Sequence, residues 1–286
     1  MAKKQFKAES KRLLDLMINS IYTHKEIFLR EIISNASDAC DKLCYLALTD
    51  DSIGMKRKDF KIELQIDKEH RILTVSDNGI GMDKDDLENN LGVIASSGSY
   101  RFKQEVGDDA KKTDVIGQFG VGFYSAFMVA DHITVVTRKH GSDTAYMWQS
   151  AGADGYSITE CERTAAGTDI VMHIKADTED EKYSEFLESW KLQELVRKYS
   201  DYIRFPIRME VSNTRKKEGL PEGSAPEYET YQEVETLNSM VPIWQRRKSN
   251  VKPEEYNKFY RDKFHDYADP QRTIVVSAEE IGRAHV

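Results

Sequence analysis

Three short motifs follow one another in a fixed order along the chain, each in or beside a predicted regular element. The first, Glu31 to Ala39, lies within a run of helical periodicity. The second, Asp77 to Met82, directly follows a predicted strand, and the third, Gly117 to Phe123, directly precedes a predicted helix. Together they provide carboxylates, an amide oxygen and two glycine-rich loops. These groups indicate a nucleotide site that lacks a Walker lysine, because the chain contains no Gly-x-x-x-x-Gly-Lys-Ser/Thr segment.

The first motif places three polar side chains at helical spacing. Glu31, Asn35 and Asp38 stand at i, i+4 and i+7, so a helix brings them to one face. Apolar residues fill another face, which is predicted to pack on a sheet: Ile33, Ala36, Cys40 and Leu43. A polar stripe is also typical of a solvated helix surface, so alone it leaves both interpretations open. Its combination with the two glycine-rich loops favours a ligand site.

Hydrophobic periodicity predicts an α+β fold. Alternating residues predict strands over 61–66, 71–76, 133–137, 145–149, 157–161, 169–174 and 207–211. Helical spacing and end signals predict helices over 10–22, 23–48, 83–91, 123–129 and 191–203. Successive strands joined by short turns favour a mainly antiparallel sheet with helices on one face, which is a two-layer α/β sandwich.

Composition shifts divide the chain into four predicted parts. Residues 1–212 form the main domain, and 213–236, which is charged and contains glycine and proline, is predicted to be a linker. Residues 237–279 are the start of a second domain. One back-translation of 280–286 matches a common sequencing-library adapter, so this tail is predicted to be non-native and is left out of the fold prediction.

Charge and composition argue against several protein classes. The net charge of −8 and the pI of about 5.5 argue against a nucleic-acid partner, which favours a concentrated basic face. No apolar run approaches the roughly 18–20 residues of a membrane span, and no apolar signal segment follows Met1, so we expect a cytoplasmic protein. Three cysteines are too few for a disulfide framework, and Cys40 and Cys44 are predicted to be buried rather than metal ligands.

The order and wording of the motifs resemble the ninety-kilodalton heat-shock chaperones in their bacterial form. The resemblance runs from about Phe6 to about Thr273, and the wider GHKL superfamily includes the ATPase of DNA gyrase, MutL and sensor histidine kinases. It implies the Bergerat-type ATP-binding sandwich in 1–212, with ATP and Mg²⁺ as cofactors. It also implies that 237–279 is only the opening of the family's middle domain, and that no dimerisation domain is included.

The resemblance assigns roles to the polar stripe. Glu31 resembles the residue that positions and deprotonates the water attacking the γ-phosphate, a task that suits a carboxylate. Asn35 resembles the Mg²⁺ ligand, for which a neutral amide oxygen suffices because the phosphates carry the negative charge. Asp38 resembles a supporting group near the sugar and phosphates.

Asp77 resembles the residue that recognises the base. Its carboxylate accepts a hydrogen bond from the exocyclic amine of adenine, whereas the carbonyl of guanine would face it unpaired. Gly79 and Gly81 are expected to let the backbone approach the base. Backbone amides of the glycine loop are expected to hold phosphates. The remaining predicted contact residues are Met82, Asn90, Gly120, Val121, Gly122, Phe123 and Thr168; Phe123 is equally compatible with a place in the core.

The segment between Gly92 and Gly117 is weakly patterned, small and polar, which is typical of a mobile lid or of a plain flexible loop. Many relatives carry a lysine in the run that reads Ala95-Ser96-Ser97-Gly98 here. Ser96 cannot supply that positive charge to the phosphates, so nucleotide affinity or lid coupling is expected to differ from theirs.

The resemblance implies an ATP-dependent chaperone whose parent is a homodimeric clamp acting on client proteins. The family completes its hydrolytic site with a middle-domain arginine downstream of this chain, so we expect the chain to bind ATP better than it hydrolyses it. Two alternatives remain. One is a nucleotide-sensing interaction module without useful ATPase activity, against which Glu31 argues. The other is a DNA-acting ATPase, against which the acidic charge argues.

Overall fold

The computed structural model describes residues 24–48, 50–93, 120–152, 155–216, 228–264 and 266–276. The predicted helix over 10–22, most of the predicted lid and the tail over 280–286 lie outside these residues. The chain divides into two compact units, residues 1–240 and residues 241–286. Each unit is described by itself below.

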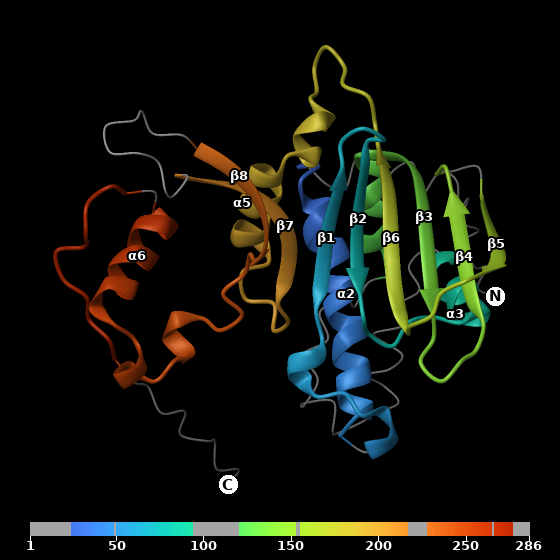
Figure 1. The fold of residues 1–286 in the computed structure, drawn as a ribbon, viewed down its shortest axis with the longest axis horizontal. Helices are drawn as coiled ribbons and strands as arrows, with labels where there is room; N and C mark the ends of the chain where they lie inside the picture. The colour runs from blue at the N-terminus through green and yellow to red at the C-terminus, as the bar shows by residue number, and fades with distance from the viewer. Residues whose placement is uncertain are drawn as a thin grey trace, which may run out of the picture. The chain divides into compact units, whose positions relative to one another are not determined.

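Within the described residues, unit 1 contains one eight-stranded sheet in the order β5-β4-β3-β6-β2-β1-β7-β8 (Figure 1). The strands are β1 (Ile62–Asp67), β2 (Ile72–Asp77), β3 (Ala130–Arg138), β4 (Ala145–Ser150), β5 (Tyr156–Cys161), β6 (Gly167–Ile174), β7 (Ile207–Lys216) and β8 (Tyr228–Thr236). Neighbours are antiparallel except β1 and β7, which are parallel. The mainly antiparallel sheet of the prediction is confirmed.

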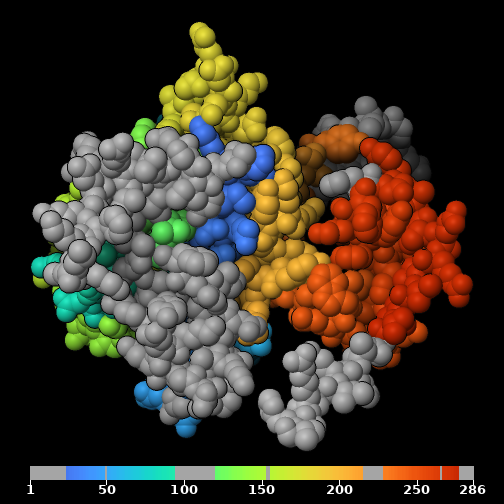
Figure 2. Space-filling view, turned by 180° about the vertical axis from the view of Figure 1, so that it is seen from behind, coloured from blue at the N-terminus to red at the C-terminus, as the bar shows by residue number. Residues whose placement is uncertain are grey.

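Helices cover one face of this sheet, so unit 1 is the predicted two-layer α+β sandwich. They are α2 (Ile27–Leu46), α5 (Ser189–Tyr199) and the 3-10 helices η5 (Gly122–Met128) and η6 (Tyr183–Leu187), with α3 (Lys84–Leu91) after β2. The short 3-10 turns η2 (Asp51–Ile53) and η3 (Arg57–Asp59) connect α2 to β1. Figure 2 shows the helical face, where the surface of α2 lies between the η5 segment and α5.

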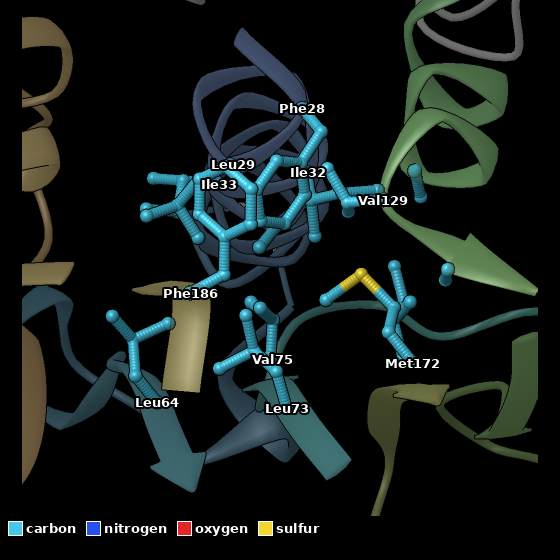
Figure 3. Close-up of a cluster of buried hydrophobic side chains, with 14 of the residues drawn as sticks. Phe28, Leu29, Ile32, Ile33, Leu64, Leu73, Val75, Val129, Met172 and Phe186 are labelled. Carbon is cyan, nitrogen blue, oxygen red and sulfur yellow. The ribbon is translucent and has the colours of Figure 1, made fainter. Parts of the chain in front are cut away.

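The core lies between α2 and the sheet. Phe28, Leu29, Ile32 and Ile33 form a fully buried stripe at helical spacing on α2. Figure 3 shows this stripe above the strand residues that face it: Leu64, Leu73, Val75 and Met172. Phe28 also meets the ring of Phe186 edge to face, with 5.1 Å between centroids. This packing fixes the orientation of α2 and therefore the position of its polar residues.

The region predicted as a linker differs in the structure. Strand β7 continues to Lys216, and β8 pairs with it from Tyr228 to Thr236. Strand β8 is the last strand of the sheet and its side chains are mostly exposed. Charged residues are common on edge strands because they discourage pairing with other chains, so a charged composition is compatible with a strand here.

The boundary between the units also lies later than predicted, after Met240. Asn238, which the sequence assigns to the second domain, is buried in unit 1. Its side chain accepts a hydrogen bond from Ile207 N at 2.9 Å and donates to the carbonyls of Ile203 at 2.9 Å and Phe205 at 3.0 Å. These bonds tie the chain after β8 to the start of β7.

Unit 2 contains η7 (Ile243–Gln245), η8 (Lys248–Asn250) and α6 (Pro253–Phe264). Within it, Trp244 packs edge to face on Phe259, with ring centroids 5.9 Å apart. In the part of the chain that the structure describes, no helix has the length and apolar character needed to cross a bilayer.

Candidate functional site

The loop after β2 rests directly on the backbone of α2. A β-carbon at Gly79 would lie 2.6 Å from both Ala39 O and Cys40 N, a separation that real β-carbons essentially never show. The next residue, Ile80, donates its N–H to Ala39 O at 3.0 Å. Only glycine fits this close approach, and it brings the second sequence motif onto the first.

The third motif meets the first at Glu31. A β-carbon at Gly122, the first residue of η5, would overlap Glu31 Oε2 and lie 3.3 Å from Glu31 Cβ. In Figure 2 the η5 segment and α2 are accordingly seen side by side. The glycine loop and the carboxylate predicted to position the attacking water are therefore neighbours.

The three polar residues of α2 differ in their exposure. Glu31 and Asn35 are half-buried, and Asp38 is only 1% exposed. Burial raises the pKa of the Glu31 carboxyl above its usual value, while the positive charge of Arg30 opposes this in part. A raised pKa makes a carboxylate a better proton acceptor near neutral pH, which suits the predicted role of Glu31.

Asp77, at the end of β2, is a buried carboxyl group with 7% of its surface exposed. Burial raises its pKa from 3.8 to about 7. The N–H of Gly79 donates to Asp77 Oδ1 at 2.8 Å and, with the more distant charge of Arg163, lowers the pKa in part. A buried carboxyl that costs free energy to ionise is typical of a functional position.

Asp77 belongs to a row of three polar side chains that crosses three neighbouring strands. In the sheet register Asp77 of β2 pairs with Thr168 of β6, and Thr168 pairs with Thr137 of β3. All three are buried, with exposures of 7%, 5% and 0% respectively. They lie at core-facing positions of the sheet, where most other side chains are apolar. This row of Asp77, Thr168 and Thr137 is called the polar floor below.

Thr137 is a candidate site residue that the sequence interpretation missed. Its Oγ1 lies 3.0 Å from each of three atoms: Gly167 O, Thr168 Oγ1 and Met82 N. The sequence signal was a hydroxyl at a position where Ile133, Val135 and Thr137 alternate toward the core. That signal has no meaning until the register shows which residues stand beside it.

Met82 and Gly81, in the loop after β2, both contact β3 beside this floor. Met82 is partly buried against the core and bonded through its N–H to Thr137. Gly81 has φ +67, and a β-carbon there would overlap Arg138 O. The glycine at 81 is therefore required by its contact with the end of β3, a reason that the sequence alone does not show.

The glycine loop enters a 3-10 helix of seven residues rather than an α-helix. The dipole of such a short helix is small, so phosphate binding would rest on the loop amides. Gly120 has φ +64 and, like Val121, is partly exposed. The ring of Phe123 is buried against Trp148, with centroids 5.4 Å apart, so its side chain belongs to the core. Only its backbone remains a candidate for a ligand.

Asn90 lies near the end of α3, one residue before Leu91, which is hydrogen-bonded to η5. Tyr124 of η5 donates its hydroxyl to Leu91 O at 2.9 Å. The other end of α3 is fixed by a reciprocal capping box between Asp83 and Asp86. The structure thus holds Asn90 beside the segment that carries the glycine loop.

The side chains present fit a magnesium ion only if a bound nucleotide and water supply most of its ligands. Among the described residues, no group of three or more His, Cys, Asp or Glu side chains is placed to hold a metal. Cys40 is fully buried, as predicted, whereas Cys44 is only partly buried, and the three cysteines are free. Asn35 is a partly exposed residue with one amide oxygen, at helical spacing from Glu31. Such a set suits Mg²⁺ that takes its other ligands from phosphates and water.

Two family models match this chain. The model described as "Histidine kinase-, DNA gyrase B-, and HSP90-like ATPase" matches residues 22–156, which include the motifs on α2, after β2 and at η5. The model described as "Hsp90 protein" matches residues 222–281, from β8 through unit 2.

Curated bacterial relatives agree with both models. "Chaperone protein HtpG" of Clostridium botulinum strain Langeland is 55% identical over 282 residues, 98% of this chain and 44% of the relative. The protein of the same name from Clostridium acetobutylicum is 56% identical over the same length, and that of Bacillus licheniformis is 53% identical over 286 residues, 45% of its length. The chain thus spans somewhat less than half of these relatives. It belongs to the Hsp90 family, within the superfamily of histidine kinase-, gyrase B- and Hsp90-like ATPases.

Proposed function

We propose that this chain is the ATP-binding part of an ATP-dependent chaperone. The observation that carries the proposal is the meeting of three motifs on one helix. Gly79 rests on the backbone of α2, and Gly122 rests on the carboxylate of Glu31. This arrangement gathers acceptors for a base, amides for phosphates and a carboxylate for water, and the ATPase family match supports it.

The base would be bound at the polar floor. Ionised Asp77 accepts from the exocyclic amine of adenine, and the loop from Gly79 to Met82 forms one wall. Because the Asp77 carboxylate is buried, water has little access to it. The amine of the ligand would supply the hydrogen bond that the buried carboxylate needs. Thr168 supplies a second polar group next to Asp77.

The phosphates would lie toward the other end of the polar stripe on α2. Backbone amides of Gly120 to Phe123 would hold them, with Asn90 nearby and Asp38 supporting the sugar side. Asn35 would hold Mg²⁺, which supplies positive charge to the phosphates. Glu31, whose pKa is raised by burial, would orient a water molecule and take its proton.

The chain corresponds to the N-terminal 44% of its relative from Clostridium botulinum. Chaperone activity is therefore proposed for a whole protein of the relatives' length. The relatives are named chaperones, which supports client proteins as partners and a homodimeric clamp as the working form. A cytoplasmic location is part of the same proposal. The chain alone would bind ATP and hydrolyse it poorly.

Turnover tests this proposal against the alternative of a non-hydrolysing nucleotide sensor. A form carrying the remaining length of the relatives should hydrolyse ATP, and Glu31→Gln in that form should abolish hydrolysis while ATP still binds. Glutamine keeps the size of the side chain but is not a proton acceptor. Hydrolysis by the Glu31→Gln form at the unsubstituted rate would contradict the role of Glu31. Binding without any turnover in the unsubstituted form would favour the sensor.

A further inference from the structure

The hydrogen bonds of Thr137 fix the direction of the hydroxyl protons in the polar floor. Its hydroxyl has one proton and accepts two hydrogen bonds. Three partners lie 3.0 Å from its oxygen: Gly167 O, Met82 N and Thr168 Oγ1. The number of partners equals the capacity of the hydroxyl, so each of them must take a defined role.

Two of these roles are set by chemistry alone. A carbonyl oxygen only accepts, so Thr137 must donate its single proton to Gly167 O. A backbone amide only donates, so Met82 N–H occupies one lone pair of Thr137. The contact with Thr168 then needs a proton from Thr168 itself, because Thr137 has none left. The Thr168 hydroxyl therefore donates to Thr137.

This direction determines what Thr168 can offer to a ligand. With its proton directed to Thr137, the Thr168 oxygen presents only lone pairs to the rest of the site. Its proton is also withheld from Asp77, the neighbour on its other side in the register. The carboxylate accepts from the backbone N–H groups of Gly79 and Thr168 and keeps its remaining acceptor capacity for a ligand. Asp77 and Thr168 thus form a pair of adjacent acceptors.

We propose that Thr137 is a specificity-determining, positioning residue, which makes the base site select a 6-amino purine over a 6-oxo purine. It acts through Thr168, which it holds as an acceptor. A pair of acceptors suits an exocyclic amine, which has two protons, and opposes a carbonyl, which has none. The inference rests on the proposed adenine-nucleotide function and deepens it.

The burial of Thr137 supports a role for its hydroxyl. The residue has no exposed surface, and a buried hydroxyl costs free energy unless it is bonded. Valine has nearly the same shape and favours strands equally, so packing alone gives no reason for a hydroxyl here. Its three bonds tie together β3, β6 and the loop after β2, which is where a base-selective floor must be rigid.

The test compares the affinities of ADP and inosine diphosphate by calorimetry at pH 8, where Asp77 is largely ionised. The dissociation constant of inosine diphosphate divided by that of ADP should be large in the unsubstituted chain. It should fall by about tenfold in Thr137→Val, because the freed Thr168 proton can serve a 6-carbonyl. Thr137→Ser keeps the hydroxyl and should keep the ratio. A purely structural loss in Thr137→Val would weaken both ligands and leave the ratio unchanged.

Thr168→Val gives an independent arm should Thr137→Val fail to fold, as judged by circular dichroism. It removes one acceptor, so the ratio should fall there as well, mainly through weaker ADP binding. An unchanged ratio in a folded Thr137→Val, or in Thr168→Val, would overturn the role of Thr137. Absence of ADP binding to the unsubstituted chain would instead overturn the proposed function, and the specificity role with it.

Discussion

Gly122 lies so close to Glu31 that a β-carbon at position 122 would overlap Glu31 Oε2 and lie 3.3 Å from Glu31 Cδ. The contact joins the glycine loop to the polar stripe of α2. Its partner atom is the end of a flexible side chain, which can move away at small cost. The contact therefore limits the position of the Glu31 carboxylate more than it limits the path of the backbone.

The first prediction follows from this contact. Gly122→Ala should fold and bind ADP, but in a full-length form it should hydrolyse ATP at least about tenfold more slowly, because Glu31 is displaced. Steady-state turnover beside ADP calorimetry measures both. Adding Gly122→Ala to Glu31→Gln should cause no further loss, since the affected group is already gone. An additional loss in the double variant would show that Gly122 acts in some other way.

The second prediction concerns Gly79, which meets backbone rather than a side chain. In Gly79→Ala the new methyl group would lie 2.6 Å from Ala39 O and Cys40 N, neither of which can move without distorting α2. We expect the free energy of unfolding to fall by about 2–4 kcal/mol. Urea unfolding measures the change.

Gly141→Ala is the matched control for Gly79→Ala. Nothing lies within 4 Å of a β-carbon at Gly141, whose φ of +80 gives only a backbone cost of about 1 kcal/mol. Equal destabilisation by the two substitutions would contradict the close approach of the β2 loop to α2.

The third prediction is a pH dependence of stability from Asp77. Its pKa is about 7 in the folded chain and 3.8 as the reference for the unfolded chain, so between these values the folded state holds a proton that the unfolded state has lost. Stability from this group is therefore full below about pH 4 and decreases as the pH rises to about 7.

Asp77→Asn removes this titration. In the absence of nucleotide, the stability of the variant relative to the unsubstituted chain should increase by about 1–4 kcal/mol between pH 4 and pH 8. Urea unfolding of both proteins at several pH values checks it. A stability difference that stays constant from pH 4 to pH 8 would show that Asp77 does not carry a raised pKa.

The sequence predicted the interior strands and the first motif's helix well, because each has one buried face. Ile62 and Leu64 of β1 alternate with more exposed partners, and the buried stripe of α2 repeats at helical spacing. Such periodicity is imposed by the core and is readable without a structure. Strand β8 has no buried face, so its pattern resembles a charged linker.

The parts of the site that the sequence could not predict depend on contacts across strands. Thr137 is 31 residues before Thr168 and 55 after Met82, and only the register brings the three together. The pKa of Asp77 likewise depends on burial by other elements. The places of Glu31, Asn35 and Asp38 were predictable, since one helix carries them. The sequence motif also predicted a phosphate-binding loop but not that η5 is a 3-10 helix.

The central claim is that Asp77 makes this site an adenine-nucleotide site. Calorimetric titration of ADP and GDP, with Mg²⁺, into the unsubstituted chain and into folded Asp77→Asn tests it most directly. We predict that one ADP binds per unsubstituted chain, that GDP binds at least about tenfold more weakly, and that Asp77→Asn shows no ADP binding while it keeps its circular dichroism spectrum. Near-equal ADP affinity in the two proteins would contradict the claim.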